Sequence, residues 1–458
     1  MAVMAVMDRL RKLWRVEQTY APVEDGTAEE GTEDARAPPK KGGFSYIEYS
    51  IFLLLGVSML WAWNMFLAAG PYFQRRFWGH RWVFENFQAA EVSVSTVTNL
   101  VSMLVLTRLQ ANASYPKRIV SSLVINMLTF ALLALLTEVF LGISPKGYFA
   151  FLMVMVFAAS LATGFCQNGI FAYVSGFGEP RYTQGIMTGQ AVAGVLPCIA
   201  QIVSVLSVPA SGGEPAPSGV NPPPVHPSSA FAYFLTATAI SVLTLLAFIF
   251  LLARNREPKT LQAHTTTDST DELDLDPQER KDIPLTTLFR KLFWLALAVF
   301  LTFAVTMVFP VFTQRIVSVR PPDDQPPLLQ PQCFIPLAFL FWNVGDLLGR
   351  LATAIPSVSL VHRPKVVFAL SASRIVFVGL YHLCNIRGQG AAVESDFFYL
   401  VVVQLLFGLT NGYLGSTCMI GAGEWVEAEE REAAGGFMGL CLVGGLTVGS
   451  LASFFLDG

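Results

Sequence analysis

Three polar residues, Asn343, Asp346 and Arg350, interrupt an otherwise apolar run at positions 341–350. Their spacings of three and four residues place all three on one face of a helix. Ionisable side chains at membrane depth are costly to bury, and they usually face one another or a water-filled cavity. The run therefore predicts a membrane helix with a polar stripe where a polar ligand can bind.

Asp346 and Arg350 form an acid–base pair at i and i+4, and a paired charge costs less to bury than a lone one. The guanidinium offers a rigid fork of donors and the carboxylate offers acceptors, so neighbouring hydroxyl groups, such as those of a ribose, could use both. Two simpler interpretations stay open. The pair could close on itself and lock helices, or Arg374 in another apolar segment could be the counterion of Asp346.

Two further apolar segments carry residues suited to a planar ligand: Trp61, Trp63 and Asn64 in one, and Gln167 and Asn168 in the other. An indole in mid-helix can stack on a ring, and side-chain amides match the paired donors and acceptors at the edge of a base. The alternatives are that the tryptophans anchor the chain at the membrane surface and that the amides join helices.

The composition of the 458-residue chain is that of a polytopic membrane protein, because 53% of its residues are hydrophobic and only 14% are charged. Soluble domains carry roughly 25% charged residues. The net charge of −3 indicates no nucleic-acid partner. Neither a phosphate-binding GxxxxGK[ST] loop nor an HExxH motif occurs, and the six cysteines are scattered singly. We expect no enzyme activity, no cofactor and no metal.

Eleven segments are long enough to cross about 30 Å of hydrocarbon. They lie near 45–70, 88–108, 118–142, 147–175, 183–208, 228–253, 287–313, 333–354, 364–385, 396–422 and 432–456. We therefore expect an all-α membrane protein with a disordered cytosolic tail at 1–44, a six-helix bundle at 45–253, a cytosolic linker at 254–286 and a five-helix bundle at 287–458.

The distribution of charged residues predicts the orientation in the membrane and bears on whether transport is coupled to protons. With the N-terminus in the cytosol, Lys and Arg are about threefold more abundant on the cytosolic side than on the opposite side, as the positive-inside rule requires. Asp346 is the acidic residue that we expect inside the membrane, with Glu138 and Glu424 near its edges. The sequence therefore does not demand proton coupling.

Small residues and prolines predict how the helices pack. Gly185 and Gly189 form a GxxxG pair, which lets helix backbones approach closely. Pro197 and Pro310 interrupt helices and each free one backbone carbonyl, which marks either a simple kink or a break near a site.

Six motifs in order resemble the equilibrative nucleoside transporter family over about 45–456. They are Trp61-Ala-Trp-Asn-Met-Phe66 with Tyr72-Phe73, Gly189-Gln-Ala-Val-Ala-Gly194, Phe341-Trp-Asn-Val-Gly-Asp-Leu-Leu-Gly-Arg350, Arg374-Ile-Val-Phe-Val, Asn411-Gly-Tyr-Leu414 and Glu432-Ala-Ala-Gly435. The resemblance implies a major-facilitator-like bundle of six plus five helices. It also implies facilitated diffusion of nucleosides, such as adenosine and uridine, by alternating access, with nucleobases as further candidate substrates.

The resemblance also implies roles for particular residues. The nucleobase is expected near Trp63, Leu67, Met103, Leu106 and Gln167. The ribose is expected at Asp346 and Arg350, with Asn343 beside them, and the cavity is expected to be shaped by Phe309, Phe339 and Leu446. Gly189 and Gly194 are expected to be positions of close helix packing.

Some positions depart from the family pattern, including Ala62 where a proline is usual, Leu67 where methionine is common, and Asn168 where glycine is frequent. An acidic loop before the last segment is closer to fungal vacuolar members. A vacuolar or lysosomal-type membrane is therefore favoured over the plasma membrane, with the chain as a monomer in the lipid bilayer. Two alternatives remain: a proton-coupled carrier that uses Asp346, and a membrane receptor that transports nothing.

Overall fold

The computed structural model describes residues 44–110, 113–139, 142–207, 227–255, 283–321 and 324–453. The tail predicted at 1–44, except for Phe44, and most of the linker predicted at 254–286 lie outside the described residues. The regular elements are helical: α2 (Tyr46–Ala68), α3 (Gly70–Phe77), α4 (Arg81–Arg108), α5 (Tyr115–Glu138), α6 (Pro145–Ser175), α7 (Pro180–Ser207), α8 (Pro227–Arg254), α10 (Leu285–Lys291), α11 (Phe293–Thr306), α12 (Val308–Thr313), α13 (Pro331–Ala352), α14 (Pro364–Ser373), α15 (Val376–Tyr381), the π-helical η5 (Phe398–Leu405), α16 (Leu406–Gly421) and α17 (Arg431–Ser453).

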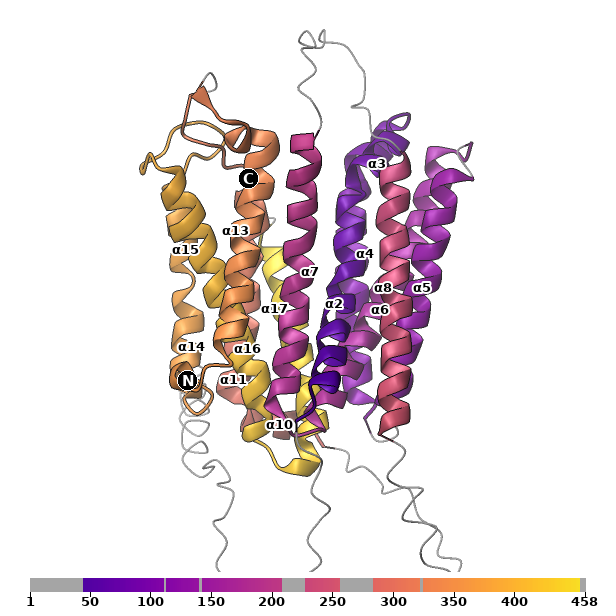
Figure 1. Cartoon of the computed structure of the whole chain (residues 1–458), viewed down its shortest axis with the longest axis vertical. Helices are drawn as coiled ribbons and strands as arrows, with labels where there is room; N and C mark the ends of the chain where they lie inside the picture. The colour runs from indigo at the N-terminus through magenta and orange to yellow at the C-terminus, as the bar shows by residue number, and fades with distance from the viewer. Residues whose placement is uncertain are drawn as a thin grey trace, which may run out of the picture.

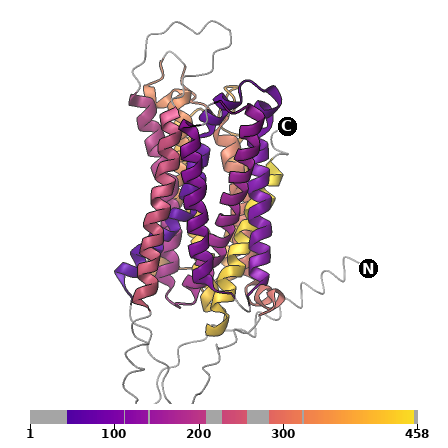
Figure 2. The same ribbon diagram turned by 90° about the vertical axis from the view of Figure 1, so that its right-hand side faces the viewer.

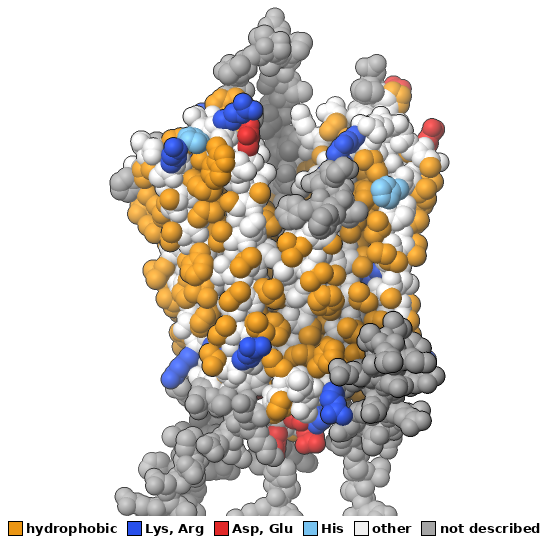
Figure 3. All heavy atoms as spheres, turned by 180° about the vertical axis from the view of Figure 1, so that it is seen from behind, with side chains coloured by type: hydrophobic (Ala, Val, Ile, Leu, Met, Phe, Trp, Pro, Cys, Tyr) orange, Lys and Arg blue, Asp and Glu red, His pale blue; other side chains and the backbone are white. Residues whose placement is uncertain are grey.

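Within these described ranges, 11 spans are long and apolar enough to cross a membrane, counting α11 with α12, α14 with α15, and η5 with α16 as one span each. A space-filling view shows hydrophobic side chains over the wide middle of one face, with Lys and Arg gathered toward its two ends (Figure 3). This is the surface that a bilayer requires. The predicted all-α fold with 11 transmembrane helices is confirmed.

The spans form two groups that lie side by side with their axes roughly parallel (Figures 1 and 2). In the first group α2 packs on α7, α5 on α8 and α4 on α6, and in the second α13 packs on α16 and α11 on both α14 and α17. The groups meet where α13 contacts α7 and where α17 contacts α4 and α6. The six-plus-five arrangement thus places the polar stripe of α13 at the boundary between the groups.

Glycines allow the closest of these helix contacts. A Cβ added at Gly189 of α7 would lie 2.0 Å from the carbonyl oxygen of Leu53 on α2. Gly345 of α13 and Gly408 of α16 show the same relation to each other's helix, with added Cβ atoms 2.1 Å and 2.0 Å from the carbonyl oxygens of Leu405 and Trp342. Backbone contact between α13 and α16 therefore fixes the depth and rotation of the α13 stripe.

Three spans of the second group are broken rather than continuous. The first span of that group breaks at Met307 between α11 and α12, just before Pro310, as the proline predicts. Another breaks at Arg374 and Ile375 between α14 and α15, and the next begins as the π-helical η5. Such irregular turns are tolerated in a membrane where neighbouring side chains satisfy the freed backbone groups.

Pro197 and Asn64 together explain a contact between α2 and α7. Pro197 has no N–H, so the carbonyl of Ala193, four residues earlier, loses its helical donor. The side-chain amide of Asn64 donates to that carbonyl oxygen at 2.7 Å. The carbonyl that the sequence predicts to be freed is thus satisfied by the asparagine of the Trp-Ala-Trp-Asn motif.

The substitution Asn64→Leu should therefore destabilise the protein by about 1–3 kcal/mol, because it leaves a buried carbonyl without a donor. The thermal stability of the purified protein in detergent measures this loss. Adding Pro197→Ala to Asn64→Leu restores the helical N–H and should recover most of the stability. A double variant no more stable than the single one would contradict this account.

Candidate functional site

The polar stripe of α13 is buried at the boundary between the two groups of helices. Asp346 and Arg350 are 3% and 4% exposed, and the Nε of Arg350 lies 2.7 Å from the Oδ2 of Asp346. Asn343 lies one turn earlier and is half-buried. The structure thus brings the predicted pair together in the geometry expected of i and i+4 positions.

The second carboxylate oxygen of Asp346 is bound by an amide from α16. The Nδ2 of Asn411 donates to the Oδ1 of Asp346 at 2.7 Å, and the Oδ1 of Asn411 accepts from the hydroxyl of Thr306 on α11 at 2.6 Å. Arg374 donates to Thr306 and to the carbonyl of Thr302, and its hydrogen bonds lead to Asp346 through Thr306 and Asn411. The direct ionic partner of Asp346 is therefore Arg350 and not Arg374.

Arg350 also reaches across to the first group of helices. Its Nη1 donates to the carbonyl oxygen of Met187 at 2.8 Å and to the Oε1 of Gln190 at 3.0 Å, both on α7. The pair is therefore not closed on itself, because one edge of the guanidinium joins the two groups. Gln190 lies in the Gly189–Gly194 motif, but sequence reasoning did not assign it to the site.

Asn343 makes a second contact between the groups. Its Nδ2 lies 3.6 Å from the Sγ of Cys198 on α7 and 2.9 Å from the carbonyl of Phe339. A Cβ added at Gly194 of α7 would lie 2.2 Å from the Oδ1 of Asn343. Gly194 therefore lies against a side chain of the opposite group.

Aromatic rings from α12 and α13 stack on one another close to the polar stripe of α13 in the sequence. Phe309 lies face to face with Trp342, with ring centroids 4.3 Å apart, and edge to face with Phe339 at 4.9 Å. The break before α12 places Phe309 in this stack. Of the residues predicted to shape the cavity, Phe309 and Phe339 are therefore in contact, and Trp342 is an additional member.

The residues expected near the base come from three helices of the first group. Gln167 on α6 is 5% exposed, and its Oε1 accepts from the Nδ2 of Asn99 on α4 at 3.5 Å. Met103 and Leu106 on α4 are buried, and an added Cβ at Gly439 of α17 would lie 3.1 Å from Met103. Asn99 was missed in the sequence, although its position four residues before Met103 places it on a neighbouring part of the same face.

Two hydrophobic residues of α2 and one of α17 complete the predicted set. Trp63 is half-buried, with its ring 6.5 Å from that of Phe66. Leu67 is 54% exposed. Leu446 on α17 is half-buried against the core that extends between both groups. Their placement beside a substrate stays a prediction.

Glu91 is an ionisable group that the sequence analysis overlooked. It lies on α4, is 6% exposed, and its Oε1 is buried without a hydrogen-bond partner. Glu91 lies inside the span expected at 88–108, and α4 begins earlier, at Arg81. The expectation that Asp346 is the acidic residue inside the membrane is therefore too narrow.

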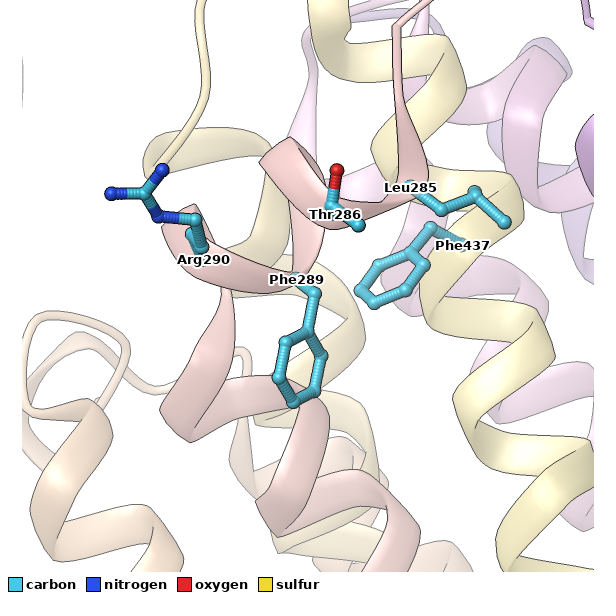
Figure 4. A pocket seen from close by; sticks show the side chains of 5 residues that line it. All are labelled: Leu285, Thr286, Phe289, Arg290 and Phe437. Atoms are coloured by element: carbon cyan, nitrogen blue, oxygen red, sulfur yellow. The ribbon is translucent and has the colours of Figure 1, made fainter. Parts of the chain in front are cut away.

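An open, apolar pocket of about 470 Å³ lies away from the stripe, at the end of the molecule that carries α10. Figure 4 shows its lining of Leu285, Thr286, Phe289 and Arg290 from α10 and Phe437 from α17. These residues are not among those predicted to bind a substrate. The pocket and the candidate site are thus separate features.

The nucleoside transporter family matches residues 152–457, which is more than half of the chain. This chain belongs to the nucleoside transporter family, and neither its family nor its fold is that of an enzyme.

Named relatives are similar along almost their whole length. The chain is 28% identical over 457 residues to the nucleoside transporter FUN26 of Saccharomyces cerevisiae, covering 92% of this chain and 86% of that protein. It is 28% identical to human equilibrative nucleoside transporter 1, covering 88% and 95%. The fungal assignment suggested by the sequence is compatible with the first of these.

Solved structures of similar shape belong to the major facilitator superfamily, as expected. The transporter FucP in its outward conformation matches with a TM-score of 0.59 at 16% identity, covering 90% of this chain and 91% of that chain. The proton:xylose symporter XylE matches with a TM-score of 0.53 at 11% identity, covering 90% and 87%. These likenesses establish the major-facilitator-like fold.

Proposed function

We propose that this protein carries nucleosides, with nucleobases as further candidate substrates, across a membrane by facilitated diffusion. The observation that carries the proposal is the buried pair of Asp346 and Arg350 at the boundary of the two helix groups, in a chain of the nucleoside transporter family. A buried pair that still offers donors to the opposite group is suited to a site that opens and closes.

Asp346 and Arg350 are assigned to the sugar, and Gln167 and Trp63 to the base. The carboxylate can accept from ribose hydroxyl groups and the guanidinium can donate to their oxygens. The Gln167 amide, held by Asn99 at 3.5 Å, can pair with a base edge, and an indole can stack on its face. Met103, Leu106, Leu67 and Leu446 supply apolar contact, and Phe309, Phe339 and Asn343 bound the sugar end.

Alternating access requires contacts between the groups that form at one end and break when that end opens. Arg350 with Met187 provides such a contact, and so does the approach of α17 to α6, where a Cβ at Gly435 would lie 2.3 Å from the carbonyl of Phe171. These contacts involve the first turns of α7 and α17 and the last turns of α6 and α13, and α17 also contacts α10. This arrangement supports a state that is closed at the α10 end.

The proposal extends to the substrates, the oligomeric state, the orientation and the membrane of this protein. Adenosine and uridine are the proposed test substrates, and the protein is proposed to act as a monomer with its N-terminus in the cytosol. A vacuolar or lysosomal-type membrane is proposed as its location, with the plasma membrane as the alternative. The excess of Lys and Arg on the cytosolic side supports the proposed orientation.

Competition for uptake tests the substrate class. Uptake of labelled uridine into vesicles that contain the protein is measured with an excess of unlabelled adenosine, uracil, or a hexose such as glucose. Adenosine should inhibit strongly and the hexose should not, because a hexose lacks a base for Gln167 and Trp63. Inhibition by the hexose alone would replace the proposal by a sugar carrier.

A further inference from the structure

We infer that Arg374 is a positioning residue for the sugar end of the site, acting on Asp346 through Thr306 and Asn411. This inference rests on the proposed function of Asp346. It assigns a role to a fully buried charge that makes no contact with the proposed ligand-binding side chains.

Arg374 lies at the break between α14 and α15 and is 1% exposed. Its guanidinium donates to the carbonyl of Thr302, to the hydroxyl of Thr306 at 3.1 Å, to the carbonyl of Phe407 at 3.4 Å and to the hydroxyl of Thr410 at 3.2 Å. It also lies over the ring of Phe407, with the guanidinium carbon 4.6 Å from the centroid. One side chain thus joins three broken spans of the second helix group.

A row of hydrogen bonds leads from Arg374 through Thr306 and Asn411 to Asp346. An arginine can only donate, so the Thr306 oxygen must accept from it and can pass its single proton onward. The Thr306 oxygen lies 2.6 Å from the Asn411 Oδ1 and 2.7 Å from the carbonyl oxygen of Thr302, which also accepts from Arg374. When the hydroxyl donates to Asn411, it links that amide to Arg374. With its Oδ1 toward Thr306, the Asn411 amide presents its NH₂ group to Asp346, where it donates at 2.7 Å.

These hydrogen bonds set how the Asp346 carboxyl group faces a bound sugar. A carboxylate only accepts, so Asn411 holds Oδ1 while Arg350 holds Oδ2, and the plane of the carboxyl group is set from both sides. Without a donor at Thr306, the Asn411 NH₂ group still faces the carboxylate, but its Oδ1 loses the hydrogen bond that holds the amide from the other side. One of the two anchors of Asp346 would then be held less firmly, and with it the alignment of the carboxyl group toward sugar hydroxyl groups.

Thr306 is the informative position for the test. Removing Arg374 itself leaves several buried acceptors without a donor and threatens the fold, whereas Thr306→Val is isosteric and removes only the connecting hydroxyl. Thr306→Ser keeps the hydroxyl. Thr410→Val is the matched control, because it removes a hydroxyl partner of Arg374 that does not lead to Asp346.

The experiment measures inhibition of labelled uridine uptake by unlabelled uridine and by 2′,3′-dideoxyuridine, which lacks the sugar hydroxyl groups. The wild-type protein should prefer uridine. Thr306→Val should reduce this preference about tenfold, the usual effect of losing a hydrogen bond to a charged group, through weaker uridine binding. Thr306→Ser and Thr410→Val should keep it.

The outcomes distinguish the role of Arg374 from the assignment of Asp346 to the sugar. A Thr306→Val protein that keeps the wild-type preference, or that weakens both compounds equally, would overturn the role of Arg374. The substitution Asp346→Asn should reduce the preference as well. If wild type shows no preference, or if Asp346→Asn keeps it, the sugar assignment under the proposed function is wrong, independently of Arg374.

Discussion

Replacing Arg350 with Ala should abolish nucleoside uptake. The change removes the partner of a buried carboxylate and the two donations to Met187 and Gln190 that join the helix groups. If the nucleoside loses about 3 kcal/mol of binding free energy, its affinity falls about 100-fold. Uptake per amount of inserted protein measures this result.

Arg350→Ala should also lower the free energy of unfolding, because an unpaired buried carboxylate costs about 3–5 kcal/mol. The double substitution Asp346→Asn with Arg350→Gln removes both charges and should recover much of the stability without recovering transport. Arg350→Lys keeps the charge but lacks the planar fork, so it should retain the protein in the membrane with reduced uptake. Normal uptake by Arg350→Ala would eliminate the assignment of the pair to the substrate.

Gly189→Ala should produce the largest loss of folded protein among single changes in the first helix group. The added methyl would lie 2.0 Å from the carbonyl oxygen of Leu53 and 2.8 Å from the amide nitrogen of Val57, and neither backbone atom can move away without separating α2 from α7. Overpacking of this kind costs about 3 kcal/mol. The amount of monodisperse protein extracted from membranes, and its melting temperature, measure the loss.

Two glycines serve as controls for this prediction. Gly379→Ala on α15 meets nothing within 4 Å and should be tolerated. Gly194→Ala approaches the Oδ1 of Asn343 at 2.2 Å, but a side chain can rotate, so that variant should fold and change transport instead. If Gly189→Ala is as stable as Gly379→Ala, the close contact of α2 and α7 is not essential.

The number of spans and the α13 stripe could be predicted because both depend on local pattern. Apolar length alone defines a span, and the spacing of Asp346 and Arg350 defines their contact on any helix. The partner of Ala193, freed by Pro197, could have been predicted only in part. The missing N–H is visible in the sequence, but the donor Asn64 comes from a helix 129 residues away.

The partners of Arg374 could not be predicted, because they belong to helices whose breaks and rotations are set by packing. The sequence permits Arg374 to pair with Asp346, and only the arrangement of α11 and α16 shows Thr306 and Asn411 between them. Glu91 was missed for a different reason. Its position in the sequence lies within a predicted span, but its burial depends on how α4 packs in the fold.

Proteoliposome uptake of radiolabelled adenosine and uridine, with and without an imposed pH gradient, tests the central claim most directly. Wild-type protein should equilibrate both nucleosides across the membrane without a gradient, and Asp346→Asn should reduce this flux. Accumulation above equilibrium that requires a gradient would contradict facilitated diffusion and identify a proton-coupled carrier, with Asp346 and Glu91 as the carboxylates to examine. Absence of flux despite nucleoside binding would contradict transport itself and identify a receptor.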